Sequence, residues 1–118
     1  MATKFDLVCE QGADLAFVVN YRRADSDIPV DITSGFARIQ ARPSVSAQTF
    51  ILDVDSGARG GIAIEGSNGR FLVFVPAAVT ATFTPTREAV YDLQYVDVAG
   101  RTSRVIEGRF RVTRQVTR

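Results

Sequence analysis

Three carboxylates in the last third of the chain come nearest, in type and spacing, to an acid–base site. Asp92 and Asp97 belong to one predicted strand and its exit, and Glu107 belongs to the strand expected to pair with it. Two convergent carboxylates can perform acid–base chemistry without histidine. If Asp92 and Glu107 share the polar face of a sheet, however, cross-strand ion pairing explains them at least as well, with Arg104 or Arg109 as the partner. We therefore expect no catalytic residues here.

Two other patterns have the outline of ligand sites without their essential residues. The segment Asp53-Val54-Asp55-Ser56-Gly57 resembles the start of a calcium loop, but Ile64 stands at the twelfth position, where an EF-hand needs glutamate. The glycines between residues 57 and 69 could form a phosphate cradle. A P-loop then requires Lys, Ser or Thr, and a helix, whereas Gly69 is followed by Arg70 and a predicted strand. We expect hairpin turns, no metal and no cofactor.

The composition excludes most of the common catalytic arrangements. The chain has no histidine, one cysteine and one lysine, Lys4. Triads that depend on histidine, Cys/His zinc sites and an intrachain disulfide are therefore impossible. The single thiol, Cys9, alternates with apolar neighbours and is expected in the core. The three tyrosines could stack sugars or bases, but such tyrosines more often lie at the edge of a β core; they are Tyr21, Tyr91 and Tyr95.

Length and patterning predict one globular domain. The chain has 118 residues, 46% of them hydrophobic and 23% charged, which is a globular balance. No apolar run reaches the roughly 20 residues of a membrane helix, and we expect no membrane partner. We interpret residues 1–118 as a single domain, with 113–118 as a basic C-terminal tail.

The charges are balanced overall and uneven along the chain. The net charge is +1, so we expect no nucleic-acid partner. Residues 101–118 contain six arginines and one glutamate, whereas residues 1–100 carry a net charge of −4. A basic last strand could dock on an acidic neighbour, including another copy of the chain, or it could be an edge strand protected by charge. The arginine excess itself could also reflect codon usage. The predicted interface residues are Arg104, Arg109, Arg111, Arg114 and Arg118.

The dominant hydrophobic period is two, which indicates strands. Turn residues divide the chain into about eight of them, and the Ala-rich stretch 76–83 predicts one or two helical turns. This pattern predicts an all-β fold, an antiparallel β-sandwich of immunoglobulin-like architecture with one short helical crossover. A small open barrel is the alternative. The expected strands are 5–9, 15–21, 36–42, 50–54, 62–64, 70–75, 88–96 and 102–112.

The order of blocks along the chain also resembles a known group of proteins. An alternating strand followed by Glu10-Gln11-Gly12, then 29–39 with its acidic-apolar-Thr step, the turn Asn68-Gly69-Arg70, the 76–81 turn, and 100–112 follow one another. This arrangement is similar to the N-terminal β-sandwich module of phage baseplate upper proteins and to small tailed-phage virion proteins with that module. The resemblance implies a multi-copy structural part of a virion, without catalytic residues.

We accordingly expect a non-enzymatic virion structural protein, assembled in the host cytoplasm. It would act as an adaptor in the tail, baseplate or head-to-tail region and contact other virion proteins and copies of itself. A capsid decoration protein is the first alternative, and it predicts copies that follow capsid symmetry. A host-glycan or other ligand-binding module is the second, and it predicts a concave patch that contains tyrosines.

Overall fold

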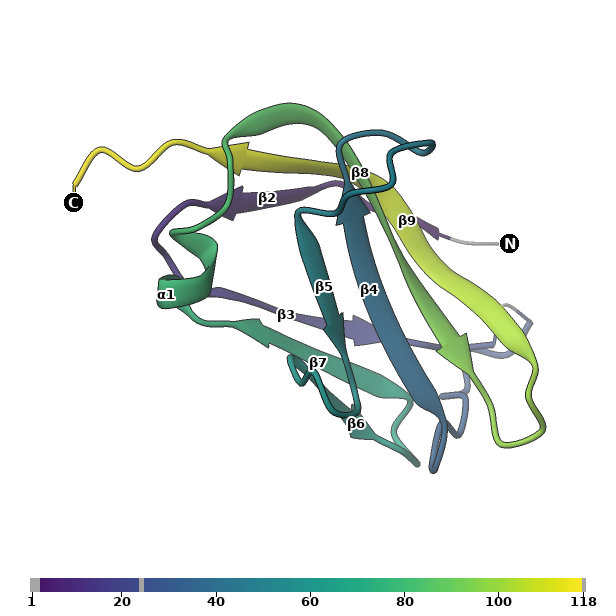
Figure 1. Cartoon of the computed structure of the whole chain (residues 1–118). Coiled ribbons are helices and arrows are strands. Elements are labelled where there is room, and N and C mark those ends of the chain that lie inside the picture. Colours follow the sequence, from purple (N-terminus) through teal and green to yellow (C-terminus); the bar gives the residue numbers. More distant parts are fainter. Residues whose placement is uncertain (1–2, 24, 118) are drawn as a thin grey trace.

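The computed structural model describes residues 3–23 and 25–117, which form two β-sheets packed face to face (Figure 1). Among these residues no helix is long and apolar enough to cross a membrane. The elements are β1 (Thr3–Lys4), β2 (Leu7–Glu10), β3 (Leu15–Asn20), β4 (Phe36–Arg42), β5 (Leu52–Asp55), β6 (Ile62–Glu65), β7 (Arg70–Val75), α1 (Ala77–Thr80), β8 (Thr86–Val96) and β9 (Thr102–Thr113).

The large sheet has the order β1-β9-β8-β4-β5, and β2 also pairs with β9. The small sheet has the order β3-β7-β6, with the apolar β7 at its centre as the sequence indicates. Two separate sheets confirm the predicted sandwich rather than the barrel. The strand order is that of an immunoglobulin-type sandwich, in which β3-β7-β6 take the places of strands B, E and D, and β5-β4-β8-β9 those of C′, C, F and G.

One feature of the pairing differs from a purely antiparallel sandwich. Strands β1 and β2 run parallel to β9, with Thr3 beside Ile106 and Leu7 beside Phe110, while all other strand pairs are antiparallel. The predicted 5–9 strand is interrupted at residues 5 and 6, where Asp6 turns its carboxylate to the backbone of β9. Gly108 permits this close approach, because a Cβ there would collide with the Phe5 carbonyl.

The core follows the period-two pattern of the strands. Tyr91, Leu93 and Tyr95 of β8 point inward and are at most 4% exposed. The rings of Tyr21, Phe71 and Tyr95 contact one another edge-on or tilted, with centroids 5.7–6.3 Å apart. Cys9 is fully buried, as predicted. Aromatic contacts of this kind stabilise a β core beyond their buried area alone.

The helix α1 lies in the crossover from the small sheet to the large one, where helical turns were predicted. The Asp14 carboxylate accepts a 2.7 Å hydrogen bond from the Ala77 N–H at its first turn. The buried Thr80 hydroxyl donates to the Ala13 carbonyl at 2.8 Å and accepts from the Gly12 N–H at 3.1 Å. These bonds attach the crossover to the β2–β3 connection.

Candidate functional site

The outer face of the large sheet carries charged side chains in rows that cross the strands. An acidic row contains Asp53, Gln40, Asp92 and Glu107, which are successive register partners on β5, β4, β8 and β9. On one side of it lie Arg38, Gln94 and Arg104, and on the other Arg42, Val90 and Arg109. The acidic row therefore lies between two rows that contain arginine.

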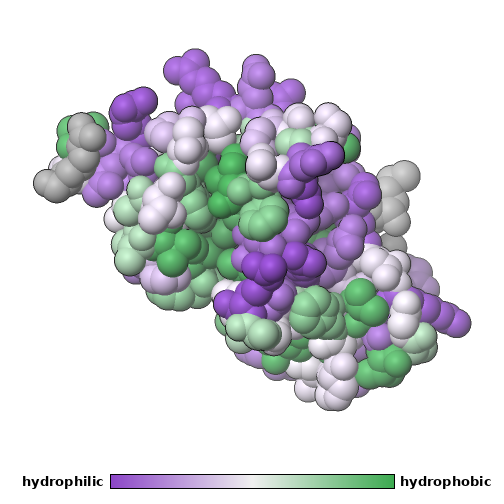
Figure 2. Space-filling view, in the orientation of Figure 1, coloured by the Kyte–Doolittle hydropathy of each residue, from purple (hydrophilic) through white to green (hydrophobic). Residues whose placement is uncertain are grey.

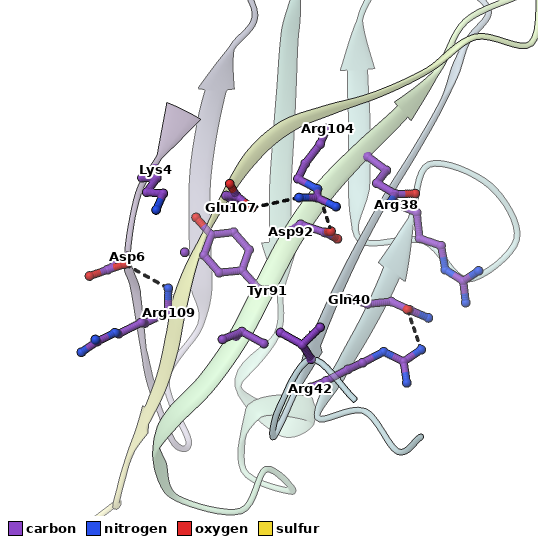
Figure 3. Close-up of a pocket in the computed structure, with 14 residues that line it drawn as sticks. Lys4, Asp6, Arg38, Gln40, Arg42, Tyr91, Asp92, Arg104, Glu107 and Arg109 are labelled. Atoms are coloured by element: carbon purple, nitrogen blue, oxygen red, sulfur yellow. Dashed lines mark hydrogen bonds and ion pairs between the residues drawn. The ribbon is translucent and has the colours of Figure 1, made fainter. Parts of the chain in front are cut away.

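The members of these rows on β4, β8 and β9 line an open groove of about 630 Å³ (Figure 3). Lys4 and Asp6 complete it from the β1 side, and Val45 closes it from the β4–β5 loop. Figure 2 shows hydrophilic side chains along the top of the molecule and in a band through its middle, with hydrophobic side chains on both sides of that band. The groove is thus a polar surface on a rigid sheet.

Arg104 joins the two acids at the centre of this face. Its guanidinium lies 3.3 Å from Asp92 Oδ2 and 3.1 Å from Glu107 Oε1. Burial raises the pKa of Asp92, the Arg104 charge opposes that rise, and the neighbouring Glu107 charge adds to it. The predicted ion pairing of Asp92 and Glu107 is therefore present, with Arg104 rather than Arg109 as the partner.

A second ion cluster holds the β5 edge. Arg38 Nε and Nη2 donate to the two Asp53 oxygens at 2.9 and 2.7 Å, and Arg59 Nη1 lies 3.5 Å from Asp53 Oδ2. The Asp53 side chain is only 2% exposed. The hydrogen bond from Arg38 is the main reason why the pKa of Asp53 lies below its ordinary value. Bidentate contacts of this kind fix both side chains in one geometry.

The five predicted interface arginines do not form one group. Arg104 and Arg109 line the groove, and Arg104 is committed to its two acids. Arg111 is exposed farther along β9 beside Val8, and Arg114 is exposed beyond the end of the strand. Arg118 lies outside the described residues.

Three basic residues of the groove were not predicted as site residues: Lys4, Arg38 and Arg42. The alternation of residues 36–42 predicts that Arg38 and Arg42 lie on the solvent-exposed face of their strand, and this could have identified them as candidates. The alternation does not predict which strand lies beside β4. Arg42 donates to the Gln40 side chain at 2.9 Å and to the Ala47 carbonyl at 2.7 Å. Neither partner is acidic, so no ion pair offsets the positive charge of Arg42 within the described part of the chain.

The other sequence candidates have structural roles. The Asp55 carboxylate accepts the N–H groups of Gly57 and Arg59 at 2.8 and 3.2 Å, and Asp53 binds arginine, so neither is free for calcium. The part of the chain that the structure describes contains no group of three metal-ligating side chains. Gly60, Gly61 and Gly69 adopt positive φ in turns.

The tyrosines and the cysteine are also parts of the core. Tyr91 and Tyr95 are buried, so their ring faces are not available for stacking a ligand. The Tyr91 hydroxyl donates to the Phe5 carbonyl, and burial, with a contribution from Asp6, raises its pKa. Burial, then the Glu10 charge, raises the pKa of Cys9 to about 11. A thiol in this state is a poor nucleophile.

Comparison with known proteins adds no identity to this picture. No protein-family model matches the chain, and no curated protein matches it. The arrangement can therefore be interpreted only by its chemistry. It is a polar sheet face with internal ion pairs, and on the outer face of β9 the guanidinium groups of Arg109 and Arg111 have no ion pair among the described residues.

Proposed function

We propose that this chain is a non-enzymatic structural protein of a tailed-bacteriophage virion. It acts as a docking module in the tail, baseplate or head-to-tail region, and contacts neighbouring virion proteins through its last strand. The virion assignment rests on the resemblance of the block order to phage β-sandwich modules. The docking role rests on the charges and edges of the large sheet.

The observation that carries the docking role is the state of Arg109 and Arg111. Both side chains are exposed on the outer face of β9, and neither guanidinium has an acidic partner within 4.0 Å among residues 3–23 and 25–117. The Asp6 carboxylate accepts a hydrogen bond from the backbone N–H of Arg109 and not from its guanidinium. Beside them, Phe5 and Val8 are 56% and 54% exposed at the open β1–β2 edge. Arginine next to exposed apolar side chains is typical of protein interfaces.

The internal ion pairs support a role without catalysis. Asp53, Asp92 and Glu107 each form an ion pair with an arginine, so their carboxylate oxygens are engaged in contacts within the sheet. A general acid needs a proton to donate, and a general base needs an accessible lone pair. Rigid docking needs neither, and closed symmetry multiplies weak contacts into a stable assembly.

The first test is whether the chain is present in particles. Particles purified from the phage or prophage that encodes the chain are analysed by mass spectrometry and by immunogold labelling. Labelling at the tail, baseplate or neck supports the proposal. Labelling over the whole capsid surface, with copies that follow capsid symmetry, supports a decoration protein instead. Absence of the chain from particles overturns the virion assignment.

The second test addresses the docking residues. The double variant Arg109→Glu/Arg111→Glu is expected to be lost from particles, because it presents negative charge to an acidic neighbour. Arg101→Glu is the matched control, since Arg101 is equally exposed but lies in the β8–β9 turn. If both variants are incorporated into particles equally well, Arg109 and Arg111 do not contribute to the interface. The mass of the purified protein at low and high salt shows whether copies of the chain also dock in this way.

A further inference from the structure

The outer face of the small sheet is apolar, in contrast to the polar outer face of the large sheet. Ala16 pairs with Phe74, and Val18 pairs with Leu72, which in turn pairs with Ala63. These five side chains therefore form one continuous patch over β3, β7 and β6. Val18 is 52% exposed and Phe74 is 51% exposed.

An exposed antiparallel sheet normally carries polar residues on its solvent face. Contiguous apolar side chains on such a face therefore make it a candidate contact surface. The small sheet forms the lower layer in Figure 1, so this face points away from the large sheet and its arginines. It is a second surface, separate from the proposed docking surface on β9 and the neighbouring β1–β2 edge.

The two ends of the patch differ in charge. Asp14 lies at the start of β3, next to the first turn of α1. Asn20, Arg70 and Glu65 form the row at the opposite end, where Arg70 Nη1 is 3.4 Å from Glu65 Oε1. Six residues of strand separate the ends by about 20 Å. The patch is thus an apolar strip with Asp14 at one end and Arg70, which is paired with Glu65, at the other.

We propose that this strip binds the same strip of a second copy, in a two-fold dimer with the two β7 strands antiparallel. In such a dimer each Phe74 packs near Leu72 of the other copy. Each Arg70 then reaches the Asp14 end of the other copy, so two equivalent ion pairs frame the apolar centre. A two-fold interface needs a self-complementary surface, and an apolar strip with opposite charges at its ends has that property.

The size of the strip sets the expected strength. Three strands about 4.8 Å apart and six residues of about 3.4 Å give a projected area of roughly 280 Å². A stable dimer typically buries about 800 Å² on each partner. The dimer is therefore expected to be weak, with a Kd in the micromolar range or above, and to become important when many copies gather. This inference goes beyond the proposed function and does not depend on where in a particle the chain lies.

The test is sedimentation equilibrium of the purified full chain from micromolar to millimolar concentration. The expected result is a reversible monomer–dimer equilibrium. Phe74→Ser is expected to raise Kd about tenfold or more, because it removes the largest side chain of the patch. Phe50→Ser is the matched control, since Phe50 is 48% exposed but lies before β5 in the large sheet. A monomer throughout, or an equal effect of both variants, overturns the proposal.

The end-to-end ion pairs have their own test, a double-mutant cycle. Arg70→Glu places two acids together and is expected to weaken the dimer. Asp14→Asn removes that repulsion while it keeps a side-chain oxygen for the Ala77 N–H. Arg70→Glu should therefore weaken the dimer less in the Asp14→Asn background than in the wild type. Equal effects in both backgrounds contradict the antiparallel arrangement. Arg109→Glu/Arg111→Glu should leave the dimer unchanged, so a failure here and a failure of β9 docking are distinguishable.

Discussion

Asp92 and Glu107 are direct cross-strand partners on β8 and β9, so two carboxylates lie side by side on the outer face of the large sheet. Like charges directly opposite each other destabilise a sheet. Arg104 lies within 3.3 Å of both acids, and its single positive charge offsets one of their two negative charges. The contacts with Arg104 therefore offset part of the repulsion between the two adjacent acids.

Removal of the Arg104 charge should expose this repulsion. Arg104→Met keeps the apolar stem and is expected to lower the free energy of unfolding by about 1 kcal/mol near pH 7. It also raises the pKa of Asp92 further. A carboxyl whose pKa is raised by folding costs stability at high pH, and the cost disappears as protonation begins at low pH. Urea unfolding near pH 7 and near pH 4 should therefore show a smaller difference from wild type at the lower pH.

Two variants give this prediction its controls. Arg101→Met removes an exposed arginine that has no ion pair among the described residues, and should have little effect at either pH. Glu107→Gln added to Arg104→Met should restore part of the lost stability. A destabilisation that is the same at both pH values would mean that Arg104 acts by packing and not by charge.

The contribution of Asp53 to stability should depend on pH in the opposite direction from the contribution of Asp92. The pKa of Asp53 is lowered, mainly by the Arg38 hydrogen bond, so its stabilising contribution is present above its pKa in the unfolded chain. Asp53→Asn is expected to cost about 1–2 kcal/mol at neutral pH. The unfolding curves of wild type and variant should converge below about pH 4, where wild type loses this contribution. Glu88→Gln, at an exposed position on β8, should show no such convergence.

Cys9 should be unreactive while the chain is folded. With a pKa of about 11, roughly one thiol in a thousand is ionised near pH 8, and the side chain is fully buried. Labelling with iodoacetamide near pH 8 should therefore be very slow in buffer and complete in concentrated urea. Rapid labelling of the folded protein would show that the β2 edge opens easily.

Much of the fold was predictable because most strands alternate between inward and outward residues. In β9 a register shift interrupts this alternation, and Val105 and Ile106 are both buried. The strands at 36–42 and 70–75 have the predicted bounds, and Gly69 adopts positive φ in the predicted turn. Strand β5 begins at Leu52 rather than Phe50, whose ring lies instead 5.9 Å from the Arg42 guanidinium. The local sequence pattern thus predicts which face of a strand is buried better than it predicts where the strand begins and ends.

Which residues lie side by side on adjacent strands was not predictable, because this depends on the pairing of segments that are far apart in the sequence. Period two placed Arg42 and Arg109 on polar faces, but only the register of β4, β8 and β9 places them on either side of Val90. In the same way, Val18 and Phe74 each look like one exposed apolar residue in the sequence. The small sheet brings them into one patch with Ala16, Leu72 and Ala63.

One of the contacts that attach the N-terminal segment joins residues 86 positions apart: the Tyr91 hydroxyl donates a hydrogen bond to the Phe5 carbonyl. Tyr91→Phe keeps the edge-on contact with Phe110 but removes this bond, and should lower the free energy of unfolding by about 1 kcal/mol. Because Phe5 also donates its N–H to Glu107, amide exchange across residues 3–10 should become faster.

Tyr95→Phe is the matched control for this measurement. Tyr95 is as deeply buried as Tyr91, yet its hydroxyl has no hydrogen-bond partner within the described parts of the chain. Its loss should leave the exchange rates of residues 3–10 unchanged. If Tyr91→Phe also leaves them unchanged, the parallel pairing with β9 alone holds the strand. If the exchange rates of residues 3–10 rise only in Tyr91→Phe, the hydrogen bond from the buried Tyr91 hydroxyl helps to hold the open edge beside Arg109 and Arg111.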